Sequence, residues 1–95
     1  MLGSVPASAA DNAAPDFDGN ARPGDNLYTA TLLAIEPKTG KLRWHHQEVP
    51  HDVWDFDSAC ELVMVDQGGK QRMTHLNKGG FVTVLDRMSG KVENV

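Results

Sequence analysis

Two stretches of this sequence align with each other, Leu32-Leu33-Ala34-Ile35-Glu36-Pro37-Lys38-Thr39-Gly40-Lys41-Leu42 and Val82-Thr83-Val84-Leu85-Asp86-Arg87-Met88-Ser89-Gly90-Lys91-Val92. Their glycines, Gly40 and Gly90, stand 50 residues apart. Each stretch is a β-prone apolar segment followed by an acid, a hydroxyl residue and Gly-Lys, which is typical of a tight turn. A repeat of this length in an all-β chain fits one four-stranded blade of a β-propeller. The alternative is that two hairpins share a common turn recipe by chance.

The rest of the sequence indicates further short strands and turns, with no convincing helical period. Strands are expected over residues 28–35, 42–46, 61–65, 71–76 and 81–86, with turns over 38–41, 67–70 and 77–80. The predicted fold class is therefore all-β, and the chain would hold about one propeller blade with parts of its neighbours. Because blades bury their faces against each other, so short a chain would be a fragment of a larger propeller or a partner for other copies.

Length and composition exclude several classes of protein. The chain has 95 residues and a net charge of −4, so it forms at most one small domain and offers no basic stripe for nucleic acid. Its apolar runs are too short for a transmembrane segment. The single cysteine, Cys60, cannot form an internal disulfide and is expected to be a small core residue. Residues 1–11 are expected to be an irregular leader, and without basic residues this leader is not a signal peptide.

The densest chemistry lies in Pro50-His51-Asp52-Val53-Trp54-Asp55-Phe56-Asp57, which we call the acidic segment (residues 50–57). If this segment is extended, Asp55 and Asp57 share one face, where two carboxylates suit a hard cation. The other interpretation is a solvated loop with Trp54 and Phe56 in the core. His51 is expected to be a hydrogen-bonded structural residue, and Asp52 and Trp54 are expected to be scaffold.

Taken together, the motifs resemble the central part of a pyrroloquinoline quinone (PQQ)-dependent alcohol dehydrogenase. The matching stretches are Asn12-Ala13-Ala14-Pro15-Asp16-Phe17, Arg22-Pro23-Gly24-Asp25-Asn26-Leu27-Tyr28-Thr29, Thr39-Gly40-Lys41-Leu42-Arg43-Trp44, the acidic segment, Lys78-Gly79-Gly80-Phe81 and Val84-Leu85-Asp86-Arg87. The resemblance covers residues 12–92 and implies an eight-bladed propeller, so residues 12–95 are expected to be a partial PQQ-type repeat region. The family's Thr-Gly-Lys-x-x-Trp docking motif is met at Trp44, whereas the second repeat carries Asn94 at that position.

The resemblance also implies roles for individual residues. Asn12, Asp55 and Asp57 would bind the active-site metal, and Asp55 would be the general base that takes the alcohol proton. Lys78 falls where the family places a basic residue against the quinone carbonyls. Asp57 indicates the lanthanide-using subclass, because calcium-type members commonly carry a small residue there. A further carboxylate offsets the extra charge of a trivalent ion. The implied cofactors are therefore PQQ and a lanthanide ion, or Ca²⁺.

The implied activity is oxidation of a small primary alcohol to an aldehyde, with hydride transfer to metal-bound PQQ. The parent family is periplasmic and passes electrons to a cytochrome c-type acceptor. The family's upstream glutamate ligand, stacking tryptophan and adjacent-cysteine disulfide lie outside this chain, so the isolated chain is expected to be inactive. Asp11 also stands where the family usually has glycine, and Asp16 stands where an aromatic residue is common.

Two other interpretations stay open from the sequence. The first is a non-catalytic PQQ-like propeller repeat that acts as a structural or interaction module. Such a repeat needs the Thr-Gly-Lys-Trp turn but no inward carboxylates, so the joint presence of Asn12, Asp55, Asp57 and Lys78 disfavours it. The second is a degraded reading frame without a function.

Overall fold

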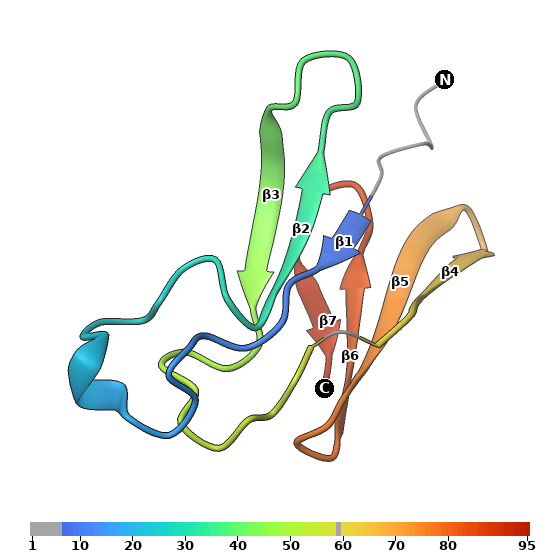
Figure 1. Cartoon of the computed structure of the whole chain (residues 1–95). Coiled ribbons are helices and arrows are strands. Elements are labelled where there is room, and N and C mark those ends of the chain that lie inside the picture. The colour runs from blue at the N-terminus through green and yellow to red at the C-terminus, as the bar shows by residue number, and fades with distance from the viewer. Residues whose placement is uncertain (1–6, 59) are drawn as a thin grey trace.

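The computed structural model describes residues 7–58 and 60–95, which form two antiparallel sheets (Figure 1). The first sheet has the order β1-β2-β3 and the second has the order β4-β5-β6-β7. The strands are β1 (Ala7–Ala9), β2 (Thr31–Ile35), β3 (Leu42–Gln47), β4 (Leu62–Gln67), β5 (Lys70–Asn77), β6 (Phe81–Asp86) and β7 (Val92–Asn94), and one 3₁₀ turn, η1, spans Gly19–Ala21. The all-β prediction is confirmed. One complete four-stranded sheet beside a three-stranded sheet matches a blade with part of its neighbour.

The sequence repeat is also a repeat of hydrogen bonds. In the β2–β3 turn, the N–H of Glu36 donates to the carbonyl of Lys41, and the N–H of Gly40 donates to the carbonyl of Glu36, each at 2.8 Å. The same two bonds recur 50 positions later, from the N–H groups of Asp86 and Gly90, again at 2.8 Å. Both glycines have φ above +70°, a backbone region that glycine enters without a steric cost. The shared turn chemistry therefore gives two equivalent hairpins.

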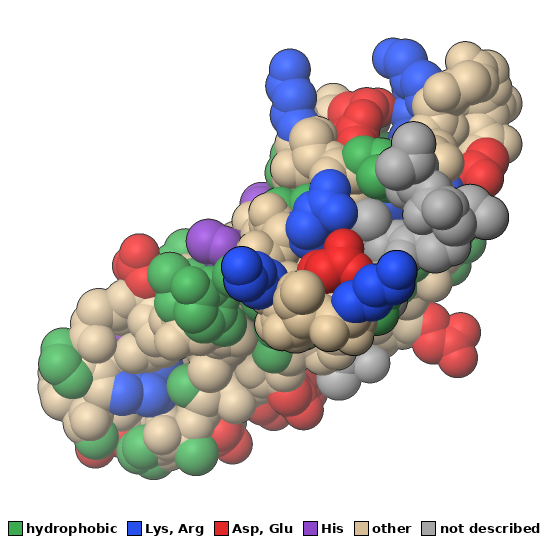
Figure 2. Space-filling model, turned by 90° about the horizontal axis from the view of Figure 1, so that it is seen from above, with side chains coloured by type: hydrophobic (Ala, Val, Ile, Leu, Met, Phe, Trp, Pro, Cys, Tyr) green, Lys and Arg blue, Asp and Glu red, His purple; other side chains and the backbone are tan. Residues whose placement is uncertain are grey.

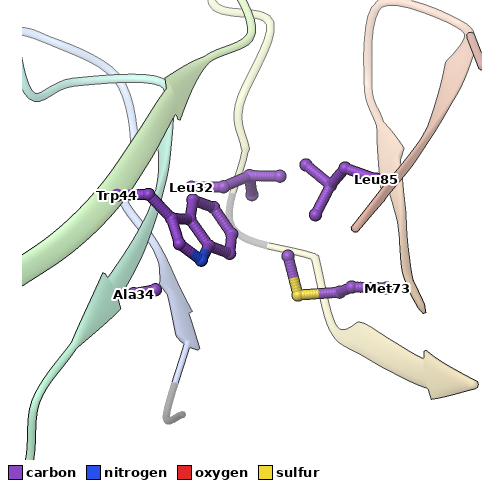
Figure 3. Close-up of a cluster of buried hydrophobic side chains, with 5 residues drawn as sticks. All are labelled: Leu32, Ala34, Trp44, Met73 and Leu85. Carbon is purple, nitrogen blue, oxygen red and sulfur yellow. The ribbon is translucent and has the colours of Figure 1, made fainter. Parts of the chain in front are cut away.

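The two repeats pack together through a hydrophobic core between the sheets (Figure 3). The first sheet contributes Leu32, Ala34 and Trp44, and the second contributes Met73 and Leu85. The indole Nε1 of Trp44 donates a hydrogen bond of 2.9 Å to the carbonyl of Arg87 in the β6–β7 turn. The ring lies so close to Gly90 that an added Cβ atom there would be 2.6 Å away. Trp44 of the first repeat is therefore the side chain that docks on the turn of the second.

The strand β1 falls within the stretch that the sequence led us to expect as irregular. Ala7, Ser8 and Ala9 pair antiparallel with Ala34, Leu33 and Leu32 of β2. Three small residues show no alternation of apolar and polar side chains, so their extended conformation depends on pairing with the neighbouring strand β2. Residues 1–6 of the expected leader lie outside the described residues.

The outer surface carries both charges and exposed hydrophobic side chains. Lys and Arg are interspersed with Asp and Glu on the face seen in Figure 2. Val63, Leu76 and Val82 of the second sheet are exposed, as expected for a blade that packs against others. Cys60 is also exposed, so its predicted place in the core is wrong. Within the described ranges, no helix is long and apolar enough to cross a bilayer.

Candidate metal and cofactor site

Three irregular segments meet near one end of the two sheets. These are the long connection between β1 and β2, the connection between β3 and β4, and the turn between β5 and β6 (Figure 1). They carry Asn12, the acidic segment and Lys78 respectively. Because sheet strands hold the ends of each segment, the fold brings together side chains that are far apart in the sequence, such as Asp55 and Lys78, which are 23 positions apart.

The acidic segment is a loop held from within by Asp52. The Asp52 side chain accepts hydrogen bonds of 2.8 Å from the N–H of Trp54 and from the N–H of Phe56. Asp52 is only 2% exposed, so these bonds lie away from competing water. They bracket Asp55, whose φ of +59° is unusual for a residue with a side chain. The segment is therefore not the extended strand that would place both carboxylates on one face, and Asp52 is the scaffold residue that was expected.

Asp55 and Asp57 nevertheless meet at one positive charge. The ammonium of Lys78 donates to Oδ2 of Asp55 at 3.0 Å and to Oδ2 of Asp57 at 3.1 Å. These hydrogen bonds, first the one to Asp55 and then the one to Asp57, outweigh desolvation and raise the pKa of Lys78. About a third of each carboxylate side chain and about half of the lysine side chain remain exposed, so ligands can reach the group. The structure thus brings three of the four predicted site residues together.

The turn between β5 and β6 places Lys78. The Oδ1 atom of Asn77 accepts a hydrogen bond of 2.7 Å from the N–H of Gly79. The N–H of Gly80, at φ +88°, donates to the Asn77 carbonyl at 3.0 Å. Asn77 therefore fixes the turn on both sides of the lysine.

Asn12, the fourth predicted residue, lies just beyond β1 and has an unsatisfied side chain. Both its Oδ1 and Nδ2 atoms are buried, and neither has a hydrogen-bond partner among the described residues. A buried amide without partners costs free energy, so a ligand that pairs with either atom would lower this cost. Over residues 7–58 and 60–95, no hydrogen bond or ion pair joins Asn12 to Asp55, Asp57 or Lys78.

Arg22 ties the Asn12 connection to the acidic segment. Its Nε donates to the carbonyl of Pro15 at 3.0 Å, and its Nη2 donates to the carbonyl of Asp16 at 2.8 Å. The same Nη2 contacts the carbonyl of Asp52. The guanidinium has five N–H donors in a rigid plane, which suits it to hold several carbonyls at once. Asn12 is therefore in a loop that is bonded to the acidic segment through Arg22.

The donor set fits a hard metal ion. Amide and carboxylate oxygens are the ligands that Ca²⁺ and other hard cations prefer. In the described part of the chain, no three His, Cys, Asp or Glu side chains converge on one point. A metal site at Asp55 and Asp57 would therefore need further oxygen donors, of which the Asn12 amide is the predicted one.

In the acidic segment, His51 is held by hydrogen bonds, whereas the side chain of Trp54 is exposed. The ring Nδ1 of His51 contacts the carbonyl of Gly24 at 2.5 Å, and the backbone N–H of His51 donates to the carbonyl of Asp25 at 3.0 Å. The predicted structural role of His51 is confirmed by these bonds. Trp54 is 72% exposed, so the interpretation that places its side chain in the core is wrong, while its backbone N–H donates to Asp52.

Comparison with known proteins identifies the family of this chain. Residues 7–92 match the family described as PQQ, the glucose/ethanol/alcohol dehydrogenase β-propeller domain. The chain belongs to this family of quinoprotein alcohol dehydrogenases, and its fold is a fragment of their propeller.

Individual relatives agree with this assignment. The chain is 44% identical over 84 residues to the quinoprotein alcohol dehydrogenase PedH of Pseudomonas putida, covering 84% of the chain and 14% of that protein. It is 45% identical over 75 residues to the lanthanide-dependent methanol dehydrogenase of Methylorubrum extorquens, covering 75% and 12%. It is 47% identical over 72 residues to the 1-butanol dehydrogenase (cytochrome c) of Thauera butanivorans, covering 72% and 10%.

A solved structure agrees as well. The europium-containing methanol dehydrogenase superposes with a TM-score of 0.83 at 32% identity, covering 90% of this chain and 16% of that one. The chain thus spans about a seventh of the length of the curated relative PedH.

Proposed function

We propose that this chain is the part of a PQQ-dependent alcohol dehydrogenase that supplies one side of the metal and quinone site. The whole protein would oxidise a primary alcohol to an aldehyde. The observation that carries the proposal is the meeting of Asp55, Asp57 and Lys78 within 3.1 Å at one exposed point. A purely structural repeat gains little from two partly exposed carboxylates on one lysine, because exposed ion pairs contribute little to stability.

The metal ligands in this proposal are Asn12, Asp55 and Asp57. The buried amide of Asn12 lacks a partner among the described residues, and a metal ion would supply one. With two carboxylates, the site offers two negative charges, which favours a trivalent lanthanide over Ca²⁺ on Coulombic grounds. The relatives named as lanthanide-dependent and europium-containing methanol dehydrogenases support this choice.

Asp55 acts as the general base and Lys78 as the cofactor contact. Oδ2 of Asp55 accepts from Lys78, while its Oδ1 makes no hydrogen bond among the described residues and can accept the proton of a substrate hydroxyl. An ammonium has three donors, and Lys78 uses two on the carboxylates, so one remains for a quinone carbonyl. PQQ, when bound beside the metal, supplies the acceptor for the hydride that leaves the alcohol carbon.

The partners and location follow from the same proposal. The electron acceptor is a cytochrome c-type protein, as the name of the Thauera butanivorans relative indicates for that enzyme. The location is the periplasm. The 95-residue chain by itself has no alcohol oxidation activity, and activity with PQQ, a lanthanide and a dye acceptor would contradict this statement.

Metal binding by the chain tests the proposal directly. Terbium luminescence should report binding, because Trp54 stands next to Asp55 in the sequence and can sensitise the ion. Asp57→Ala should weaken Tb³⁺ binding more than Ca²⁺ binding, while the matched control Asp25→Ala should change neither. Asp25 is exposed, and its side chain makes no hydrogen bond or ion pair in the described part of the chain. Equal Tb³⁺ affinities for the two variants, or no binding by the wild-type chain, would refute the metal site.

A further inference from the structure

A buried carboxylate that the sequence motifs did not single out lies beside this site. Glu48 directly follows β3 and begins the connection that contains the acidic segment. Its side chain has no exposed surface, yet it accepts hydrogen bonds from four side chains. These are Ser58 (2.9 Å), His75 (3.0 Å), Asn77 (2.9 Å) and Thr83 (3.2 Å). A buried charge is tolerated only when it is paired and hydrogen-bonded, and Glu48 meets both conditions.

His75 is the positive partner of Glu48. Its Nδ1 lies 3.0 Å from the carboxylate, and its Nε2 lies 3.0 Å from the carbonyl of Cys60, so both ring nitrogens face acceptors. A neutral imidazole has one N–H donor, whereas the imidazolium has two. Burial lowers the pKa of His75, but the hydrogen bond and charge of Glu48 outweigh it, and the pKa is raised. Burial raises the pKa of Glu48, but hydrogen bonds from His75 and Asn77 lower it overall.

The arrangement of Ser58, His75 and Glu48 is not a nucleophilic triad. In such a triad the second imidazole nitrogen contacts the hydroxyl, but here Nε2 contacts the Cys60 carbonyl and the hydroxyl donates to Glu48. The Ser58 and His75 residues are also fully buried, so a substrate has no access. The network therefore acts on structure rather than by covalent chemistry.

The partners of this pair flank the proposed site on both sides. Ser58 follows Asp57, and the Cys60 carbonyl lies two residues further along. Asn77 precedes Lys78, and its Nδ2 donates to both Glu48 and the Oγ of Ser58, each at 2.9 Å. One buried network therefore holds the end of the acidic segment and the start of the lysine turn.

We propose that the buried Glu48–His75 ion pair is a positioning element that sets the distance between the Asp55–Asp57 carboxylates and Lys78. The role of those three residues rests on the proposed function, whereas the ion pair itself does not. Removing one charge leaves the other buried without compensation, so the network has to rearrange. Groups that orient metal ligands in this way act through the ligands and do not touch the substrate.

The charge state of His75 can be tested on the wild-type chain alone by ¹⁵N NMR of the imidazole rings. At a pH slightly above the ordinary histidine value, both ring nitrogens of His75 should give imidazolium signals. His46 provides the internal contrast, because burial lowers its pKa despite the opposing charge of Glu48. One unprotonated ring nitrogen in His75 under these conditions would overturn the proposal.

The positioning role requires variants with a matched control. Glu48→Gln keeps the shape but removes the charge, and Glu93→Gln makes the same change in the partly exposed Arg72–Glu93 pair of the second sheet. Glu48→Gln should weaken Tb³⁺ binding by about 10–100-fold, the range found when groups that orient metal ligands are removed. Glu93→Gln should leave the affinity unchanged. Wild-type affinity in folded Glu48→Gln would refute the positioning role.

A second variant covers the case in which Glu48→Gln does not fold. Ser58→Ala removes one hydroxyl and leaves the ion pair in place, and it should speed hydrogen exchange at the Lys78 ammonium by about fivefold, the equivalent of one ordinary hydrogen bond. Unchanged exchange would count against the proposal. This measurement needs neither metal nor quinone. If the wild-type chain binds no Tb³⁺, the proposed metal site fails while lysine exchange still decides the positioning role.

Discussion

Substituting Gly90 by alanine should destabilise the chain more than the same change at Gly40. The two glycines occupy equivalent positions of the two hairpins and have similar φ values of +77° and +72°. Around Gly40 there is no atom within 4 Å of an added Cβ, whereas at Gly90 three ring atoms of Trp44 lie within 2.6–2.7 Å. The pair of variants therefore separates the backbone cost from the cost of moving the indole.

The expected magnitudes follow from these two surroundings. Gly40→Ala carries only the cost of a left-handed residue with a side chain, about 1–2 kcal/mol. Gly90→Ala carries the same cost together with overpacking against Trp44, which adds about 1–3 kcal/mol. Since 1 kcal/mol shifts the melting temperature of a domain of this size by about 4–8 °C, the additional destabilisation of Gly90→Ala over Gly40→Ala should be measurable.

Urea unfolding followed by far-ultraviolet circular dichroism gives both free energies without relying on tryptophan fluorescence. A third variant, Gly90→Ala in a Trp44→Ala background, isolates the contact, because removing the indole should remove most of the excess. Equal losses for Gly40→Ala and Gly90→Ala would show that Trp44 does not dock on the second turn, and the packing described for the two repeats would be refuted.

Three further outcomes are expected. Trp44→Phe should lower the free energy of unfolding in urea by about 1–3 kcal/mol, since a buried carbonyl loses its donor. The same change at Trp54, which is 72% exposed, should cost less than about 0.5 kcal/mol, and similar losses would contradict the core assignment. The His75 contribution to stability should be full below its unfolded pKa of 6.5 and decline as pH rises through the raised folded pKa. The Glu48 contribution should be present above 4.5 and decline as pH falls through the lowered folded pKa. Urea titrations at a series of pH values should show both declines in stability, and His75→Gln should lack the decline at higher pH. A decline at higher pH of wild-type size in that variant would contradict its assignment to His75. Asp52→Ala should cost roughly 2–4 kcal/mol and speed amide exchange within the acidic segment, because two hydrogen bonds to a charged group are lost; unchanged exchange would contradict its scaffold role.

The hairpins could be predicted from local sequence because their information is local. An acid such as Asp86 accepts from the N–H groups of Met88 and Ser89, and Gly90 supplies the left-handed residue. These bonds span two or three positions, so the residues that make them are visible as a motif. The strand β1 had no such motif, because its partner is β2, more than 20 residues away.

The residues of the candidate site also divide into those that local sequence motifs indicate and those that depend on distant partners. Asp55, Asp57 and Lys78 could be selected from motifs, and the geometry joins them at 3.0 and 3.1 Å. Glu48 and His75 could not, because their bonds link positions 27 residues apart and neither residue lies in a distinctive pattern. Only the folded sheets place such partners at hydrogen-bonding distance, away from water.

The sequence by itself determined the repeat, the turns, the all-β class and the family, because these depend on residue type and short spacing. The tertiary structure alone decided which side chains are buried and what each contacts. It turned the acidic segment into a loop around Asp52, exposed Trp54 and Cys60, and buried Glu48 against His75. The physical reason is that burial and long-range pairing depend on the packing of both sheets together, which no local stretch of sequence encodes.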